Sequence, residues 1–549
     1  METPELRARF VKNDFWIIAL IVIYMILGII NLKNFSISWD EGLGNLFFGE
    51  RYLYYFATFN PVYLDFNESD LSIHKRVPNL FNSPWRDHPN EFPPLADTVS
   101  ALSTEVFAFR LGVMNPIDAF HLPKILLSGL LLGVLYWFAA PHMGRFSAFL
   151  GILALGFYPR FWGDMHFNPK DIPITALFSF VLVLFYSWYR SPSWLKTIGL
   201  GLLGGAALST KANALFIPVV IILGIWPWQW KWPPWGLVIN HLKKRYRNYL
   251  VMVIIALSIH ILSWPYLYAD PLRRIYRYYR FIFTQGERGG IGHWNLDPLM
   301  QTFTTMPEVI ILLLEAGIFF AILQVSKGKD RPYFQLLLAW IAVPIFRASL
   351  PSAQNFDGIR HFLEFLPAAC LLAGYGAGRI TNYLTRWKPN FSFIWNFIIG
   401  ALLLTNLLIA HWVYQPYQYI YFNSLAGGLD GARNQLNNPE ATDYWAVSYR
   451  EGIDWLNENA EREAKISAPI AQWNFKLIAP LWMRSDLGYI SRKSADEYLA
   501  DGYNVYLMYI TREGFYSPII HECRDNYTIV HRIIVDRVPI LEICKLENQ

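Results

Sequence analysis

Charged residues are scarce in this sequence. Asp, Glu, Lys and Arg make up 16% of the 549 residues, whereas hydrophobic residues make up 54% and aromatic residues 17%. Soluble domains carry about 25% charged residues, so the deficit excludes an ordinary soluble protein and indicates a membrane protein. The net charge of +5 adds little, because in a membrane protein the positions of the cations matter more than their sum.

A small-residue cleavage site is missing after the first apolar run. The run covers residues 15–30 and is followed by Asn31-Leu32-Lys33-Asn34. A cleavable signal peptide ends in such a site, so we expect the run to be retained as the first membrane span.

Tandem repeats and the inverted repeats of many transporters are also absent from the sequence.

Cysteine is rare too. Cys370 lies in an apolar run, Cys523 and Cys544 lie near the C-terminus, and no metal-ligand spacing is visible. We therefore assign no residue as a metal ligand, and the sequence leaves open whether a divalent metal takes part. Cys523 and Cys544 could pair if they face an oxidising compartment, but two free thiols is the interpretation that we favour.

Eleven apolar segments have the length, or nearly the length, of a transmembrane helix, which needs about 20 residues. They are residues 15–32, 124–140, 146–162, 172–189, 197–209, 212–226, 249–264, 307–325, 334–350, 361–377 and 393–412. The sequence therefore predicts a polytopic α-helical membrane protein with about eleven spans.

Basic residues follow the positive-inside rule if the N-terminus is cytoplasmic. The predicted inner loops are all basic, with Arg145; Arg190 and Lys196; residues 243–247; Lys327, Lys329 and Arg331; and Arg379, Arg386 and Lys388. An odd number of spans then places the C-terminal tail outside. We expect a multi-pass protein of the plasma (inner) membrane.

Three long segments fall on the outer side: residues 33–122, 265–306 and 413–549. The second is rich in arginine, against the positive-inside rule, with Arg273, Arg274, Arg277, Arg280 and Arg288. Either the span count is wrong there, or these arginines have a role outside the membrane.

The tail changes composition. Residues 443–456 have the apolar stripe of a helix, and strand-like runs follow at 465–470, 505–510, 528–535 and 538–543. We therefore expect a membrane domain of residues 1–412, with a large first outer loop, and a C-terminal exoplasmic α/β domain of residues 413–549.

Two adjacent carboxylates, Asp40 and Glu41, follow the first span. At that place they are costly unless water, a cation or a substrate meets them. Apolar residues after them recur at helical spacing, so the pair opens a helix along the membrane surface. Alternatively, Ser38 or Asp40 simply caps that helix. His88 and Glu91, in the proline-rich loop 83–94, are candidates to meet the pair.

Further titratable residues gather in the other outer turns. The turn 162–173 holds Asp164, His166, Lys170 and Asp171; a later turn carries Lys211; and Arg360 and His361 begin a span. Asp171 fits a helix start, whereas His166 and Lys170 have no such structural role. An arginine fork suits phosphate, which it binds with two parallel hydrogen bonds.

On one side of the membrane, these residues set a carboxylate pair opposite a ring of Lys, Arg and His. The cations would stabilise a phosphate as it leaves, and a carboxylate could take a proton from an incoming hydroxyl. These residues therefore predict an enzyme that transfers a group from a lipid phosphate to an alcohol.

These motifs, in this order, resemble the family-39 glycosyltransferases. The matching stretches are residues 39–42 (Trp-Asp-Glu-Gly), 166–173, 210–211, 357–361 (Asp-Gly-Ile-Arg-His), 415–428 and 443–445, so the resemblance covers most of the chain. The family includes the dolichyl-phosphate-mannose–protein mannosyltransferases and the lipid A aminoarabinose transferase, and this chain is similar to its prokaryotic members.

The resemblance implies the membrane-embedded GT-C fold and a sugar donor on a polyprenyl phosphate, such as dolichyl-phosphate-mannose. It implies that Asp40 is the catalytic base of an inverting transfer and that Lys211, Arg360 and His361 lie near the donor phosphate. Asp164, His166, Lys170, Asp171 and His88 would support them. We predict that Glu41 is catalytic as well, either by positioning a cation or a sugar hydroxyl or by sharing the role of base. The loop 265–306 is too short for the β-trefoil domain of the eukaryotic protein mannosyltransferases.

We therefore expect a glycosyltransferase, of hexosyl or mannosyl type, that acts on a protein, lipid or glycan hydroxyl at the outer face of the membrane. Its partners would be the bilayer, the lipid-linked sugar and the acceptor, without nucleic acid. The alternative is a flippase or transporter of lipids or polysaccharides, which predicts charges near mid-membrane and related halves.

Overall fold

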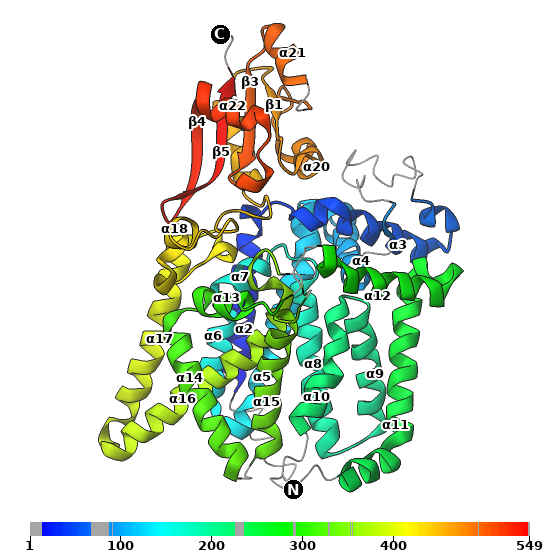
Figure 1. Ribbon diagram of the computed structural model, residues 1–549, viewed down its shortest axis with the longest axis vertical. Helices are drawn as coiled ribbons and strands as arrows, with labels where there is room; N and C mark the ends of the chain where they lie inside the picture. Colours follow the sequence, from blue (N-terminus) through cyan, green and yellow to red (C-terminus); the bar gives the residue numbers. More distant parts are fainter. Residues whose placement is uncertain are drawn as a thin grey trace.

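The computed structural model describes residues 14–66, 87–89, 92–225, 235–288, 293–327, 330–351, 353, 355–491 and 494–546. Long helices run side by side in a bundle, and a small sheet formed by the C-terminal residues stands beyond one end of it (Figure 1).

Each of the eleven expected spans overlaps a helix of the bundle, but the segments 146–162, 212–226 and 361–377 do so only in part. The helices are α2 (Phe15–Asn31), α5 (Pro116–Met143), α6 (Arg145–Gly156), α8 (Asp171–Arg190), α9 (Trp194–Leu208), α10 (Ile217–Ile225), α11 (Trp235–Leu262), α14 (Glu308–Lys327), α15 (Arg331–Ala348), α16 (Leu366–Trp387) and α17 (Ser392–Tyr414). In the described part of the chain, six are long and apolar enough to cross a membrane. The chain is a helical membrane protein, and the count of eleven spans stays a prediction.

Large apolar side chains cover the outside of the bundle. On α11, Leu250, Val253 and Ile254 are exposed, and on α17 so are Phe397 and Trp412. Apolar patches of this extent are rare on proteins surrounded by water. These exposed apolar faces are therefore suited to contact with lipid.

Helix α16 packs against α6 and α14, and its glycines let it approach both closely. A Cβ atom at Gly374 would lie 2.2 Å from the carbonyl oxygen of Ser147 on α6, and one at Gly376 would lie 2.0 Å from that of Leu313 on α14. Small residues at such crossings let helix backbones approach in membranes.

Shorter helices lie across the end of the bundle that faces the sheet, as α3, α4 and α12 do in Figure 1. This set comprises the π-helical turn η2 (Glu41–Asn45), α3 (Leu46–Thr58), α4 (Leu95–Ser103), the π-helix η6 (Thr104–Arg110), α7 (Pro159–Asp164), α12 (Pro271–Arg288) and α13 (Asp297–Thr305). The 3₁₀ segments here are η1 (Leu32–Asn34), η3 (Pro61–Leu64), η7 (Ala212–Phe216), η8 (Pro265–Ala269) and η9 (Gly358–Phe365). The helix expected after Asp40 and Glu41 is thus present as η2 and α3.

The C-terminal residues form a five-stranded mixed sheet in the order β2-β1-β3-β5-β4. Strands β2, β1 and β3 are parallel, whereas β5 is antiparallel to both β3 and β4. The elements are α18 (Gly428–Asn434), α19 (Tyr449–Asn459), β1 (Lys465–Ser467), α20 (Gln472–Trp482), β2 (Gly488–Tyr489), α21 (Ala495–Ala500), β3 (Val505–Ile510), α22 (Pro518–Asn526), β4 (Thr528–Val535) and β5 (Val538–Leu546). Short 3₁₀ turns, η10 (Pro389–Phe391), η11 (Gln418–Ile420), η12 (Ser424–Ala426) and η14 (Glu513–Phe515), complete the described chain.

Two expectations for the tail were wrong in detail. The helix expected from residue 443 begins at Tyr449, because the Asp443 carboxylate accepts hydrogen bonds from the backbone N–H groups of Trp445 and Ser448 and holds a turn. Cys523 of α22 and Cys544 of β5 form a disulfide rather than two free thiols, because α22 packs back onto the sheet.

Candidate active site

The segment that carries Asp40 lies between the bundle and the C-terminal sheet domain. Ser36 donates its backbone N–H to the carbonyl of Val447 (3.3 Å), and Asn474 of α20 donates to the carbonyl of Ile37 (3.3 Å). Gly42 passes so close to α20 that a Cβ atom there would lie 1.9 Å from Asn474 Oδ1. The C-terminal residues therefore help to fix the backbone around Asp40.

Asp40 presents its carboxylate to the site. The side chain is 35% exposed, and Oδ2 accepts a hydrogen bond of 2.9 Å from Nη1 of Arg360. Asp40 occupies the N-cap position of η2 but makes no side-chain cap hydrogen bond. Oδ1 accepts no hydrogen bond within the described parts of the chain. Asp40 therefore does not act as the cap that its position alone would suggest, and one of its oxygens is open.

Arg360, at the start of η9, contacts three carboxylates. Besides Asp40, its guanidinium contacts Asp357 Oδ2 at 3.1 Å and Asp171 Oδ2 at 3.8 Å. It lies over the ring of Trp445 at 4.5 Å from the centroid. This arrangement fixes the plane of the fork beside Asp40.

Two lysines complete the positive side of the site. Lys211 pairs with Asp171, and the Lys170 ammonium lies 2.6 Å from Asp97 Oδ2 on α4. Asn168 also donates to Asp171 (2.9 Å). Lys170, Asp171, Lys211, Arg360 and Asp40 thus converge, as the sequence predicted for these turns.

Two further arginines, which the sequence analysis missed, reach this region. Arg347, at the end of α15, donates to the carbonyl of His361 and to Asn213 (2.9 Å). Arg512, which follows β3, donates to Asp357 Oδ1 (2.8 Å). Arg347 ends an apolar run, which is a usable signal, whereas Arg512 lies more than 150 residues from Asp357 and has none.

Asp357 therefore joins Arg512 of the C-terminal domain to Arg360 of the site. Burial raises the pKa of Asp357 to about 6, against the opposing effect of the two arginines. Arg512 also covers Trp39, with its guanidinium 5.7 Å from the ring centroid. Arg512 thus links the C-terminal domain to Trp39, the residue before Asp40. Through Asp357 and Arg360 it is also linked to Asp40 itself.

Glu41 points away from this site. Its side chain is 0% exposed; Oε1 accepts from the Lys124 ammonium (3.0 Å), and Oε2 contacts His121 Nε2 (3.1 Å). Oε2 also accepts from the N–H and the hydroxyl of Ser38 (2.8 and 3.0 Å). Burial alone would raise its pKa, but the charges and hydrogen bonds of these partners lower the pKa of Glu41 to about 2. The two adjacent acids are therefore separated, with Asp40 in the site and Glu41 in a buried network with α5.

The other predicted residues take less direct positions. His166 is buried and stacked on Phe35, with its ring centroid at 4.4 Å, and burial lowers its pKa to about 3, so it is neutral. Burial and the charge of Asp171 raise the pKa of Asp164 to about 8, so it is protonated at neutral pH. His88 is exposed in the loop before α4, and Glu91 lies outside the described residues.

His361 stays close to the site. Its ring packs edge-on against Phe356, with the centroids 4.5 Å apart, and the buried Nε2 has no hydrogen-bond partner among the described residues. That buried nitrogen therefore keeps an unused hydrogen-bonding capacity. No group of three or more His, Cys, Asp and Glu side chains that could hold a metal ion is found in the described part of the chain.

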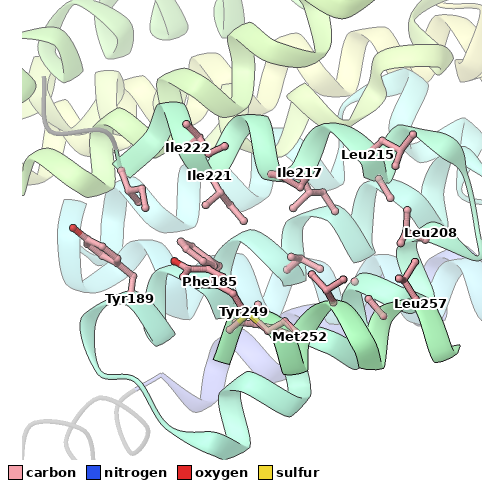
Figure 2. A pocket seen from close by; sticks show the side chains of 18 of the residues that line it. Phe185, Tyr189, Leu208, Leu215, Ile217, Ile221, Ile222, Tyr249, Met252 and Leu257 are labelled. Atoms are coloured by element: carbon pink, nitrogen blue, oxygen red, sulfur yellow. The ribbon is translucent and has the colours of Figure 1, made fainter. Parts of the chain in front are cut away.

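An apolar groove of about 810 Å³ runs between α8, α9, α10 and α11. Figure 2 shows Tyr189 and Phe185 toward one end and Leu208, Leu215 and Leu257 at the other. Leu208 and Leu215 flank the turn that carries Lys211. One end of the groove therefore lies beside the turn that carries Lys211.

Comparison with known proteins gives structural neighbours only, since no family model and no curated protein sequence matches the chain. ArnT from Cupriavidus metallidurans, solved with undecaprenyl phosphate, is 14% identical with a TM-score of 0.48, over 97% of this chain and 98% of that one. The archaeal oligosaccharyltransferase AglB from Archaeoglobus fulgidus, solved with an inhibitory peptide and a dolichol phosphate, is 11% identical with a TM-score of 0.46, over 91% of this chain and 70% of that one.

The mycobacterial arabinofuranosyltransferase AftD is 12% identical with a TM-score of 0.43, over 98% of this chain and 40% of that one. All three neighbours are glycosyltransferases of the GT-C type, the class that the sequence resembles. At these identities the likeness assigns no sugar and no acceptor to this chain.

Proposed function

We propose that this chain is an inverting glycosyltransferase that moves a sugar from a polyprenyl phosphate to a hydroxyl acceptor. The observation that supports the proposal is the apolar groove, one end of which is lined by Leu208, Ala214 and Leu215 on either side of the turn that carries Lys211. Lys211 pairs with Asp171, which also contacts Arg360, the partner of Asp40. A ligand that fits both parts has a long hydrocarbon chain and an anionic head, which describes a polyprenyl phosphate. The reaction would take place at the outer face of the membrane.

The donor would lie with its hydrocarbon chain in the groove, whose volume falls in the usual range of about 300–1,000 Å³ for ligand sites. Its phosphate would then meet Lys211, Arg360 and Nε2 of His361. The cations already pair with Asp171, Asp40 and Asp357, so they are held in place before a phosphate arrives. Preorganised cations stabilise the charge that develops on a leaving phosphate.

Asp40 would act as the general base. The acceptor hydroxyl donates its hydrogen to Oδ1, the oxygen left open by Arg360, and its oxygen attacks the anomeric carbon. The bond from that carbon to the phosphate oxygen breaks, the electron pair leaves with the polyprenyl phosphate, and the proton passes to Asp40. Attack opposite the leaving group inverts the anomeric centre. The sugar is a hexose such as mannose, by resemblance to the family.

Filling the groove tests the donor assignment. At Gly204 a new Cβ atom would meet only Ala256 at 3.9 Å, so Gly204→Leu adds bulk to the groove without a backbone clash. We expect it to weaken binding of a long-chain polyprenyl phosphate at least tenfold, since the added side chain occupies space that the hydrocarbon needs. Binding is measured by native mass spectrometry of the full chain titrated with the lipid.

Gly400→Leu on α17 is the matched control, because a Cβ atom there also has its nearest neighbour at 3.9 Å, on Leu150. It should bind the lipid as the wild type does. Equal lipid binding by the wild type and by both variants would refute the groove as the donor site.

Arg360 is expected to bind the donor phosphate through its fork. Arg360→Ala should weaken donor binding more than Arg360→Lys, because lysine keeps the charge but not the two parallel hydrogen bonds. The loss of one charge-assisted hydrogen bond is about 1.5–3 kcal/mol, or roughly 10- to 150-fold. If both variants bind the lipid donor like the wild type, Arg360 has only a structural role.

Arg512 is expected to position Arg360 through Asp357. Arg512→Ala should lower kcat by about tenfold with little change in KM for the acceptor, because a misplaced fork affects the transition state most. Arg512→Lys should recover part of the loss. Arg532→Ala removes an exposed arginine paired with Glu542 in the same domain and should leave turnover unchanged. Equal turnover by the Arg512→Ala and Arg532→Ala variants would exclude the positioning role.

A further inference from the structure

Helix α12 presents three different faces, and the proposed reaction uses none of them. Its arginines are the ones that depart from the positive-inside rule. The helix lies across the ends of the bundle helices, level with α3 and α4 (Figure 1). It follows directly from α11 through η8.

The first face of α12 packs on the protein. Tyr278 is buried in an aromatic cluster with Phe48 and Tyr52 of α3 and with Trp264, and Ile275 and Ile282 pack against the same cluster. Arg274 lies on the protein side as well, with its guanidinium 4.5 Å from the ring centroid of Tyr266. This face fixes the rotation of the helix about its axis.

The second face is apolar and exposed. Leu272, Tyr276 and Phe283 are 84%, 64% and 61% exposed. With 3.6 residues per turn, these three side chains project within about 40° of one another. Three large apolar side chains on one exposed stripe, at the end of a membrane bundle, fit the interface between lipid tails and headgroups.

The third face is cationic. Arg273, Arg277 and Arg280 are exposed and recur every three or four residues, so they form a stripe centred about 90° from the apolar one. Among the described residues, none of the three side chains has a carboxylate partner. When the apolar stripe is immersed among the lipid tails, the arginine stripe lies at the level of the lipid headgroups.

We propose that Arg273, Arg277 and Arg280 form a binding surface for the anionic headgroups of phospholipids in the leaflet that faces the active site. Charge complementarity identifies the occupant, because phosphodiester headgroups are the anions found at that depth and unpaired arginines bind them. The inference is independent of the sugar-transfer reaction. It also accounts for arginines on a side of the membrane where the positive-inside rule predicts few.

Photoactivatable lipids test this directly. The full chain is reconstituted in nanodiscs of phosphatidylcholine that contain photoactivatable phosphatidylglycerol or, separately, photoactivatable phosphatidylcholine, and the crosslinks are mapped by peptide mass spectrometry. We expect residues 271–284 of the wild type to be labelled at least about tenfold more by the anionic lipid, the scale set by several basic residues near a charged surface. Equal labelling by the two lipids would overturn the proposal.

The triple variant Arg273→Gln, Arg277→Gln, Arg280→Gln should label equally with both lipids, whereas the triple Arg→Lys variant should keep most of the preference. The control Lys243→Gln, Lys244→Gln, Arg247→Gln removes the same charge near the start of α11 and should keep the preference on α12. A preference that survives in the triple Gln variant would overturn the proposal. So would labelling that equimolar polyprenyl phosphate suppresses but excess phosphatidylglycerol does not, since the occupant would then be the donor.

Discussion

Replacing Asp40 by asparagine should reduce turnover by about 100-fold or more, the scale of general-base catalysis. Asparagine has the same shape and can still accept the hydrogen bond from Arg360, so the fold and donor binding should persist. It cannot take a proton from the acceptor hydroxyl. Since Asp40 makes no cap hydrogen bond, helix capping offers no competing explanation for the loss.

The measurement is transfer of sugar from purified polyprenyl phosphate sugar to an acceptor, together with donor binding. Asp357→Asn is the matched control, because it makes the same chemical change in another carboxylate that Arg360 contacts, at 3.1 Å. It should cost far less turnover than Asp40→Asn. Turnover by Asp40→Asn within a few-fold of the wild type would refute Asp40 as the base.

Replacing Glu41 by alanine should destabilise the protein instead. The change leaves the Lys124 ammonium and the His121 ring buried without a carboxylate, and breaking a buried ion pair in this way costs about 3–5 kcal/mol. Thermal unfolding of the detergent-solubilised protein should show a clear fall in the transition temperature. A Glu41→Ala variant as stable as the wild type would contradict the buried network.

The double variant Glu41→Gln, Lys124→Met separates stability from catalysis. Removing both charges of a buried pair is often nearly neutral, so this protein should recover much of the lost stability and keep most of its turnover. If it folds well but transfers no sugar, Glu41 has a catalytic role after all.

The pH dependence gives a second check on Glu41. Its folded pKa of about 2 lies below the ordinary value of 4.5, so the stability that it contributes is present above pH 4.5 and is lost as the pH falls through 2. The difference in stability between the wild type and Glu41→Gln should therefore shrink over that interval.

Local signals in the sequence predicted the helices well, and they predicted that the charged turns lie together. Apolar runs located the bundle helices, and the charged turns after them brought Lys170, Asp171, Lys211 and Arg360 to one end of the bundle. These predictions succeed because helices in lipid are long and continuous and their loops must lie at the two ends. The four predicted strands were found, whereas β2, with two residues, was too short to carry a pattern.

Features that depend on contacts between residues far apart in the sequence could not be predicted. The separation of Asp40 from Glu41 depends on the packing of α5, which supplies His121 and Lys124 about 80 residues away. The disulfide depends on how α22 folds back on β5, and the contact of Arg512 with Asp357 depends on how the sheet domain meets the bundle. Composition and periodicity contain none of this information.

Identifying the lipid that copurifies with the protein tests whether the donor is a polyprenyl phosphate bound in the apolar groove. The full chain is purified in mild detergent, its lipids are extracted, and the headgroup is identified by mass spectrometry, with Gly204→Leu and Gly400→Leu treated in parallel. We expect a polyprenyl phosphate, free or bearing a sugar, that is retained by the wild type and by Gly400→Leu and is depleted at least tenfold in Gly204→Leu. Bulk phospholipids alone, in equal amounts from all three proteins, would contradict it.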